Sequence, residues 1–376
     1  MKVIVAGDFC PRFRVQEMFD VGDYSAFNEI RATLSDADYS IVNLECPIVV
    51  DDACQPIKKC GPNLKTTSTV IKSLQYAGFD CVTLANNHFR DFGDDGCRST
   101  IDLLNRVGVD YVGGGCNLSE AQQILYKNIG GNILAVINIC EKEFSIATND
   151  SAGSAPIDLI DNYYQIVEAR GKADFVLMIV HGGHEYYQLP SLRMKKLYHY
   201  FVELGVDAVV NHHQHCYSGY EYYNGKPIVY GLGNLCFDSS NHRNSVWNDG
   251  YMVSINFGVD ITLELVPYKQ CALSPTVELL DENMRSQFNK SLSELNNVIA
   301  DDKLLDKSFK EFALTRKKMI MSIFASYHNK YLNAAAYRSL IPYPLRDGEV
   351  EALENFIMCE SHRDVVNSIL SDLKQN

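Results

Sequence analysis

The stretch Cys81-Val-Thr-Leu-Ala-Asn-Asn-His88-Phe-Arg-Asp91-Phe-Gly93-Asp-Asp-Gly96 decides the predicted fold. It opens with an apolar run that contains β-branched residues, which is typical of a buried strand. The run ends in Asn86-Asn87-His88, and the Asp and Gly residues that follow predict a loop. Ligands of open α/β sheets gather at the carboxyl ends of strands, so a site is expected here. Asn-Asn-His can also be ordinary turn chemistry, but the same pattern of a strand followed by polar residues recurs four more times before residue 240.

The composition is that of a globular protein with an acidic balance. The chain has 376 residues, of which 46% are hydrophobic and 22% charged, and this length suits one large or two smaller domains. A net charge of −13 argues against nucleic-acid binding. An anionic small molecule or polymer is the expected partner, since a bound metal can invert the local field. Nothing in the sequence indicates an oligomeric state.

The cysteines and the N-terminus bear on location. The twelve cysteines contain no C-x-x-C pair and several stand in apolar runs, so reduced thiols in a cytoplasmic protein are expected. The apolar stretch at the N-terminus has only five residues, too short for a signal peptide or a membrane span. No later run reaches about 18 apolar residues, and we expect no membrane span.

Strands and helices alternate through the first two thirds of the chain. Apolar runs predict strands at residues 2–6, 41–42, 81–85, 133–139, 175–180, 208–210, 227–232 and 251–257. Periodic patterns predict helices at residues 27–34, 69–77, 97–107, 163–170 and 191–204. This alternation indicates parallel β-α units in a layered α/β domain. After about Pro267 the pattern turns helical, so we expect a catalytic domain over residues 1–270 and a mostly helical C-terminal region over residues 271–376.

Side chains of the kind that bind metals stand at five strand ends: Asp8, Glu45, Asn87-His88, His181 and His212-His213-x-His215. This mixture of oxygen and imidazole ligands suits Mn, Fe, Zn or Mg, and no set of thiolates demands a structural zinc. A carboxylate at Glu45 could bridge two metals about 3.5–4 Å apart, as in sites of phosphoryl displacement. His213 and His215 would face one cavity if their segment is extended. The isolated histidines are expected to be core or surface residues: His199, His242, His328 and His362.

Longer motifs surround these residues and occur in order along the chain. They are Asn43-Leu-Glu-x-Pro47, Leu84-Ala-Asn-Asn-His-x-x-Asp-x-Gly-x-x-Gly96, His181-x-Gly-x-Glu-Tyr186, His212-His-x-His215 and Gly225-Lys-Pro-Ile-Val-Tyr-Gly-Leu-Gly-Asn-Leu-x-Phe-Asp238. Over roughly residues 1–258 the chain resembles the bacterial capsule-synthesis proteins of the CapA (poly-gamma-glutamate) family. That family is similar to the calcineurin-like metallophosphoesterases. The resemblance implies an α/β fold, a four-layer α-β-β-α sandwich, and a site for two divalent ions at one end of the sheets. With the helical pattern after about Pro267, the expected fold is this sandwich with a helical C-terminal region.

The resemblance also implies roles for individual residues. The implied metal ligands are Asp8, Glu45 in place of a bridging aspartate, Asn87, His181, His213 and His215. His88 is implied as the proton donor or transition-state contact. Asn86 and Glu185 stand in the same motifs and are further candidate catalytic residues.

Two positions depart from the family pattern. Cys10 stands where the first motif has a histidine, which removes a ligand from one metal. We expect Cys10 to line the cavity, because the other ligands are hard oxygens and imidazoles. The glycine of the final motif is also missing. Either Asn211 or His212 takes its place, so His212 stays a candidate metal ligand.

Three functions are compatible with these residues. The first is a metal-dependent, phosphoesterase-like hydrolase in capsule, surface-polysaccharide or polyglutamate biosynthesis, in which a water activated at the metals attacks phosphorus and His88 protonates the leaving oxygen. The second is a hydrolase or transferase acting on a gamma-glutamyl amide bond. The third is a non-catalytic assembly factor whose cleft binds an anionic polymer. The presence of the His and Asn ligands favours an enzyme.

Overall fold

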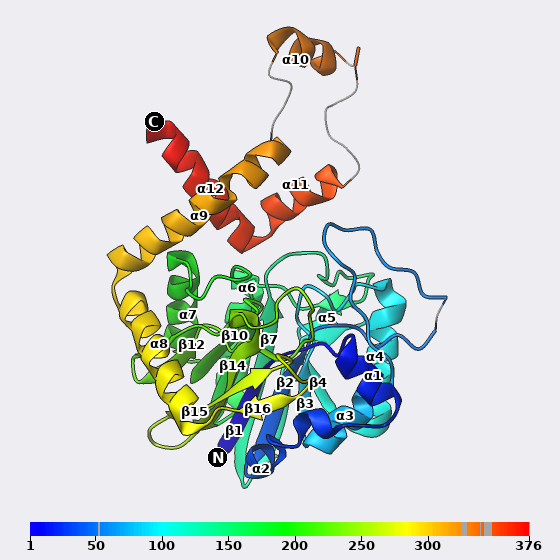
Figure 1. Ribbon diagram of the computed structural model, residues 1–376, viewed down its shortest axis with the longest axis vertical. Coiled ribbons are helices and arrows are strands. Elements are labelled where there is room, and N and C mark those ends of the chain that lie inside the picture. Colours follow the sequence, from blue (N-terminus) through cyan, green and yellow to red (C-terminus); the bar gives the residue numbers. More distant parts are fainter. Residues whose placement is uncertain (52, 325–328, 339, 342–347, 376) are drawn as a thin grey trace.

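Two β-sheets packed face to face lie at the centre of the structure (Figure 1). The computed structural model describes residues 1–376 except 52, 325–328, 339, 342–347 and 376. In strand β1 (Lys2–Phe9), Val3 and Val5 pack between the sheets, while Ile4 and Ala6 pack on the outer face against helices. Successive side chains of a strand point to opposite faces, so a strand that is apolar throughout needs cover on both sides. The layers are therefore helix, sheet, sheet and helix.

The first sheet has eight strands, and the second has six. In spatial order the first contains β16 (Val277–Leu279), β15 (Thr262–Gln270), β14 (Asp249–Asn256), β1, β2 (Tyr39–Leu44), β3 (Cys81–Thr83) and β4 (Asp110–Val112), with β13 (Asn234–Cys236) paired to β1. The second contains β11 (Tyr220–Tyr223), β12 (Lys226–Val229), β10 (Ala208–His212), β9 (Phe175–His181), β7 (Asn132–Cys140) and β6 (Leu125–Ile129). A short ribbon joins β5 (Gly114–Gly115) to β8 (Gly153–Ser154). Strands β1 to β4 are parallel to one another, as are β7, β9, β10 and β12.

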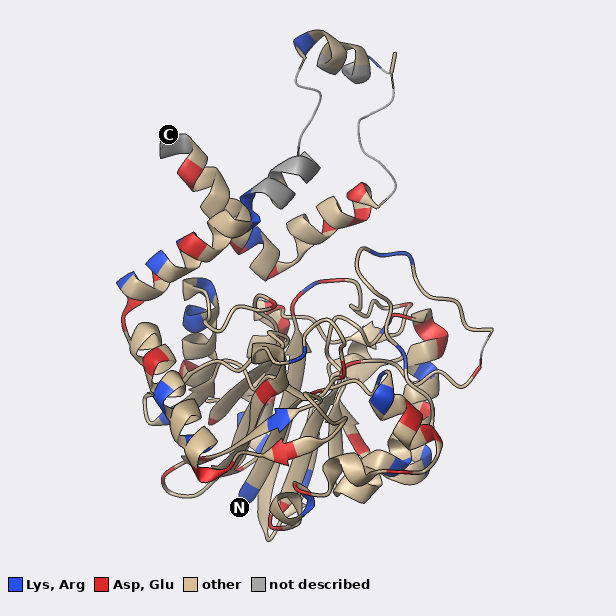
Figure 2. Ribbon diagram, in the orientation of Figure 1, with Lys and Arg blue, Asp and Glu red and all other residues tan. Residues whose placement is uncertain are grey.

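Helices cover the outer faces of both sheets. The first sheet is covered by α1 (Arg14–Asp20), α2 (Arg31–Ser35), α3 (Thr69–Ala77) and α4 (Gly93–Val107), and the second by α6 (Leu159–Lys172) and α7 (Leu192–Glu203). The short helices are α5 (Leu118–Ala121) and the 3-10 turns Ser25–Phe27 and Val246–Asn248. Local sequence sets the helix ends: α3 and α4 end at Gly78 and Gly108 in the left-handed conformation, and the Asp158 side chain caps α6. Charged residues lie mainly on helices and loops, and the strands are mostly uncharged (Figure 2).

The chain finishes in a series of helices. They are α8 (Glu282–Ala300), α9 (Asp302–Phe324), α10 (Lys330–Tyr337), α11 (Glu349–Met358) and α12 (Glu360–Gln375). Phe288 and Leu292 of α8 join the core between the sheets. Helices α9, α11 and α12, here named the C-terminal helices, pack around a small core of their own. They lie across the end of the sheets at which β1 finishes (Figure 1).

The architecture agrees with the sequence. The expected four-layer α-β-β-α sandwich with a helical C-terminal region is confirmed. The expected division after residue 270 falls between β15 and β16, which pair within the first sheet, and the helical segment begins at Glu282. In the described part of the chain, no helix combines the length and apolarity needed to cross a lipid bilayer.

Candidate metal centre

The candidate site lies where parallel strands of both sheets end. Asp8 stands near the end of β1, and Glu45 directly follows β2. His181 ends β9 and pairs in register with His212 at the end of β10. Strands that run in one direction finish at a common edge, so residues distant in sequence meet there.

His213 and His215 leave the strand in an unusual backbone conformation. Their φ angles are +93° and +55°, in the left-handed region that non-glycine residues rarely adopt. The segment is therefore not extended, which differs from the expectation stated above. The chain bends sharply after β10, and the bend brings each imidazole to a different group of ligands. Two residues in this conformation, separated by a single residue, are typical of a functional site whose surroundings hold the strained backbone in place.

The ligand-type side chains form two groups that share one carboxylate. Glu45, His181 and His213 form the first, and Asp8, Glu45 and His215 form the second; in each, the ligand atoms lie within 4.8 Å of one another. Glu45 Oε1 lies 3.7 Å from His181 Nε2 and 3.6 Å from His215 Nε2. Asn87 belongs beside the first group, because its Oδ1 lies 3.0 Å from His181 Nε2.

The environment of Glu45 fits bound cations. The side chain is fully buried, and neither carboxylate oxygen has a hydrogen-bond partner among the described residues. Burial, together with Asp8, raises its pKa well above the usual value. A buried carboxylate without a partner is costly, and a cation between these groups would remove that cost. Carboxylate, amide and imidazole donors suit divalent metals at both groups.

His181 is in the form that binds metal. Burial and the neighbouring histidines lower the pKa of His181 well below its usual value, which keeps the ring neutral. Its Nε2 lies 3.0 Å from His213 Nδ1, so the two rings converge on one position.

Two asparagines orient the ligands. The Asn43 amide donates to Asp8 Oδ1 at 2.7 Å and lies 3.3 Å from His181 Nδ1. Asn234 Oδ1 lies 2.9 Å from His215 Nδ1, which leaves His215 Nε2 facing Glu45. Such contacts hold the tautomer and direction of a ligand. Neither asparagine was among the residues predicted for the site, although each is a buried amide at or beside a strand end and lies within one of the motifs quoted above.

His88 faces the cavity from a loop that binds its other nitrogen. His88 Nδ1 lies 2.6 Å from Asp91 Oδ2, and Lys59 pairs with the same carboxylate. The backbone N–H of Leu64 also donates to Asp91. Burial lowers the pKa of His88, while Asp91 acts in the opposite direction. The Nε2 atom is the part of the ring left for a ligand.

The other two catalytic candidates occupy different places. Asn86 is fully buried; it donates to the Leu44 carbonyl at 2.9 Å and accepts from the His88 N–H at 3.1 Å. It therefore braces the loop and is not on the cavity wall. Glu185 lines the cavity, where burial raises its pKa but the nearby histidines outweigh this and lower it.

His212 and Cys10 lie outside both ligand groups. His212 Nε2 lies 3.0 Å from the Ala6 carbonyl oxygen, so the ring bridges β10 and β1 between the sheets. Cys10 is fully buried in the hydrophobic core that faces α1 to α4, and its N–H donates to the Cys236 carbonyl. Cys10 packs into this core near Glu45, whose pKa it helps to raise, so its place as a lining residue of the metal site stays a prediction.

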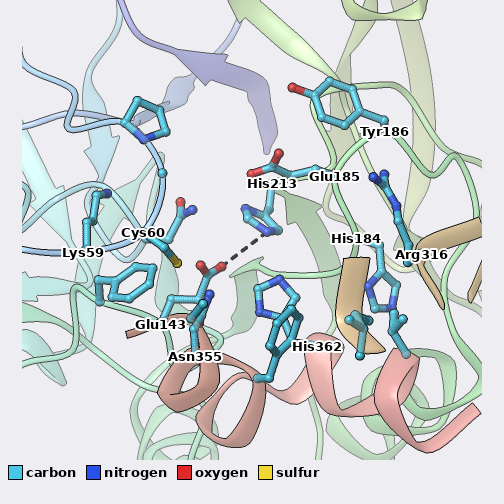
Figure 3. A pocket seen from close by; sticks show the side chains of 18 of the residues that line it. Lys59, Cys60, Glu143, His184, Glu185, Tyr186, His213, Arg316, Asn355 and His362 are labelled. Carbon is cyan, nitrogen blue, oxygen red and sulfur yellow. Dashed lines mark ion pairs between the residues drawn. The ribbon is translucent and has the colours of Figure 1, made fainter. Parts of the chain in front are cut away.

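A cavity of about 430 Å³ opens from the metal ligands toward the C-terminal helices (Figure 3). Figure 3 shows His213 near its centre, with Glu143 Oε1 3.5 Å from His213 Nε2. His362, which was expected to be an ordinary core or surface residue, lies on the cavity wall. His199 and His242 are ordinary, since they stack on Tyr223 and on Tyr186 with Trp247, respectively; His328 lies outside the described residues.

Comparison with known proteins gives relatives in bacterial capsule synthesis. The family described as bacterial capsule synthesis protein PGA_cap matches residues 2–239. The capsule biosynthesis protein CapA of Bacillus anthracis is 29% identical over 296 residues, which are 75% of this chain and 71% of that protein. The PGA biosynthesis protein CapA of Bacillus subtilis is 31% identical over 221 residues, 58% of each chain.

Solved structures show more distant likeness. A putative 5'-nucleotidase from Staphylococcus aureus, in complex with alpha-ketoglutarate, is 15% identical with a TM-score of 0.42, covering 78% of this chain and 58% of that one. A hypothetical protein from Thermus thermophilus is 15% identical with a TM-score of 0.44, covering 71% of this chain and 99% of that one.

Proposed function

Because the chain belongs to the bacterial capsule synthesis protein PGA_cap family, which includes the CapA proteins of capsule and polyglutamate biosynthesis, we propose that it is a metal-dependent, phosphoesterase-like hydrolase. The observation that carries the proposal is Glu45, a buried carboxylate that two ligand groups share and that has no hydrogen-bond partner among the described residues. Displacement at phosphorus commonly uses two divalent ions about 3.5–4 Å apart. A single carboxylate can bridge ions at that separation.

The chain's own residues have distinct tasks in this proposal. Asp8, Asn87, His181, His213 and His215 would hold the ions together with Glu45. Ions bound there supply positive charge to a phosphoryl group and activate water toward it.

His88 would hold the proton for the leaving oxygen. Its Nδ1 is engaged by Asp91, which leaves Nε2 toward the cavity and partly offsets the lowering of the His88 pKa by burial. Lys59 neutralises Asp91 and keeps the loop in place. The substrate is proposed to be an anionic phosphate ester in the assembly of a surface polymer.

A cytoplasmic location is part of the same proposal. All twelve cysteines are unpaired, and Cys236 Sγ and Cys271 Sγ lie 3.8 Å apart without a bond. Free thiols this close are expected in a reducing compartment.

The test is hydrolysis of aryl phosphates by the purified protein after metal removal and reloading with Mn²⁺, Zn²⁺ or Mg²⁺. We expect turnover only with metal, and its loss in Glu45→Gln. His199→Gln is the matched control. The His199 ring lies 2.7 Å from Glu221 Oε1 and belongs to neither ligand group. Metal bound at full occupancy without turnover of any phosphate ester would reject the proposal.

A further inference from the structure

The C-terminal helices form the wall of the cavity that faces the metal ligands. Helix α9 contributes Phe312 and Arg316, α11 contributes Asn355 and Phe356, and α12 contributes His362 and Val365. This wall is largely apolar, so the polar groups on it are exceptions that call for an explanation.

Three polar atoms on the wall and beside it have no hydrogen-bond partner among the described residues. They are His184 Nε2, Asn355 Oδ1 and His362 Nδ1. His184 is only 5% exposed and Asn355 only 8%, so water does not readily replace the missing partners. A buried polar group without a partner is costly, and a bound ligand would remove that cost.

Arg316 adds a positive charge to the same wall. Its guanidinium lies 5.3 Å from the centre of the Phe312 ring and pairs with no carboxylate among the described residues. The other cation of the cavity, Lys59, is already paired with Asp91. The cavity's acids, Glu143 and Glu185, stand with the metal-ligand loops, and Glu143 is engaged with His213.

Figure 3 shows how these groups are placed. Arg316 and His184 lie together on one side of the cavity, across from Lys59 and Cys60. His362 and Asn355 lie along the helical wall below His213. The cavity thus has a metal-binding side and a separate polar wall that carries a cation.

We propose that Arg316, with His362 and His184, forms a second anion subsite that binds a carboxylate or phosphate carried by the substrate away from its scissile phosphate. The inference rests on the proposed function, which places the scissile phosphate at the metal ligands. A guanidinium presents a planar fork that matches either oxyanion, and the apolar wall strengthens such a contact by excluding water. The substrate class is therefore a phosphate ester with a second anionic group.

The test compares the binding of non-hydrolysable probes to the full, Mn²⁺-loaded chain by calorimetry. Benzylphosphonate has one anionic group, 4-(phosphonomethyl)benzoate adds a carboxylate, and p-xylylenediphosphonate adds a second phosphonate. We expect one of the two probes that carry a second anionic group to bind about 10- to 100-fold more tightly than benzylphosphonate, the range of a charge-assisted contact. Which of the two gains more identifies the second group as carboxylate or phosphate.

Arg316→Gln should abolish this preference, so that the three probes bind alike, because glutamine lacks the guanidinium that lies over Phe312. Lys307→Ala is the matched control: it removes a positive charge from the same helix at a site 72% exposed, and should keep the preference. Equal binding of all three probes to the unaltered chain, or a preference that survives in Arg316→Gln, would overturn the inference.

The two proposals fail in different ways. Aryl phosphates that are not hydrolysed, with an Arg316-dependent probe preference intact, would reject the hydrolase and support the subsite. Metal-dependent hydrolysis with no probe preference would reject the subsite alone.

Discussion

At the scale of single residues, Glu45 links the two ligand groups. It comes from the first sheet, while His181 and His215, which approach the same oxygen, come from the second sheet and the bend behind it. A side chain that serves two groups has a different mutational signature from one that serves a single group.

Glu45→Gln is therefore expected to lose both ions, because a neutral amide is a poor substitute for a bridging carboxylate. His213→Ala and His215→Ala should each lose one ion in preference to the other, since each belongs to one group. Elemental analysis of the purified variants measures this. His212→Ala should keep its metal, and two ions retained in Glu45→Gln would contradict the shared role.

His88→Ala separates proton donation from metal binding. The ring belongs to neither ligand group, so metal content should stay unchanged. Turnover of an alkyl phosphate should fall by roughly 10²–10⁴-fold, the range for loss of a general acid. Nitrophenyl phosphate, whose leaving group needs little protonation, should lose much less. Steady-state rates on the two substrates give the comparison, and equal losses would remove His88 from this role.

At the scale of secondary structure elements, a buried ion network docks α12 on the sheet. Arg193 of α7 contacts Glu141 after β7 at 2.6 Å and Asp364 of α12 at 2.7 Å. The Ser361 hydroxyl also donates to Glu141 at 2.8 Å. Burial alone would raise the pKa of Glu141, but Arg193 and Ser361 outweigh it and lower the pKa to about 2. The cavity wall depends on this network.

Arg193→Met should lower the free energy of unfolding by about 3–5 kcal/mol, because it leaves the buried Glu141 charge without its cation. The double variant Glu141→Gln/Arg193→Met should recover much of that loss. Urea unfolding of the three proteins measures it. Equal losses in the single and double variants would show that the charge pairing is not the cause.

The same network predicts a pH dependence. The pKa of Glu141 is lower in the folded chain than its ordinary 4.5, so its contribution to stability is complete above that pH and is lost as pH falls toward 2. Between about pH 5 and 3, the free energy of unfolding should therefore fall more steeply with decreasing pH for the unaltered chain than for the double variant.

At the scale of the whole molecule, the metal centre joins the two sheets. Each ligand group takes side chains from both of them, because Asp8 and Glu45 lie at strand ends of one sheet and the histidines lie at strand ends of the other. Bound ions would thus stabilise the packing of the sheets as well as the site.

Chelation is expected to lower the melting temperature, and Mn²⁺ or Zn²⁺ to restore it. A ligand that binds only the folded state at about 100 times its Kd adds about 2.7 kcal/mol of stability. Differential scanning calorimetry with and without chelator measures the change. The variant His213→Ala/His215→Ala should not respond to either treatment, and a response equal to that of the unaltered chain would place the ions elsewhere.

Patterns in the sequence predict the layered α/β fold and identify most of the candidate ligands. Both are local signals: period-two and continuous apolar runs specify strands, and polar residues such as Asp8 and His181 stand out where those runs end. The resemblance to a known family assigned Glu45 the bridging position.

The grouping of these residues depends on how distant segments of the chain pack together. The left-handed backbone at His213 and His215 sends the two rings to different groups, and adjacent His212 turns between the sheets; both depend on packing that no local pattern encodes. The amphipathic pattern of the C-terminal helices shows that each buries one face, but not against what. Arg316 and His362 line the cavity because these helices dock over it. That docking joins segments far apart in the chain, so the role of the two residues is visible only in three dimensions.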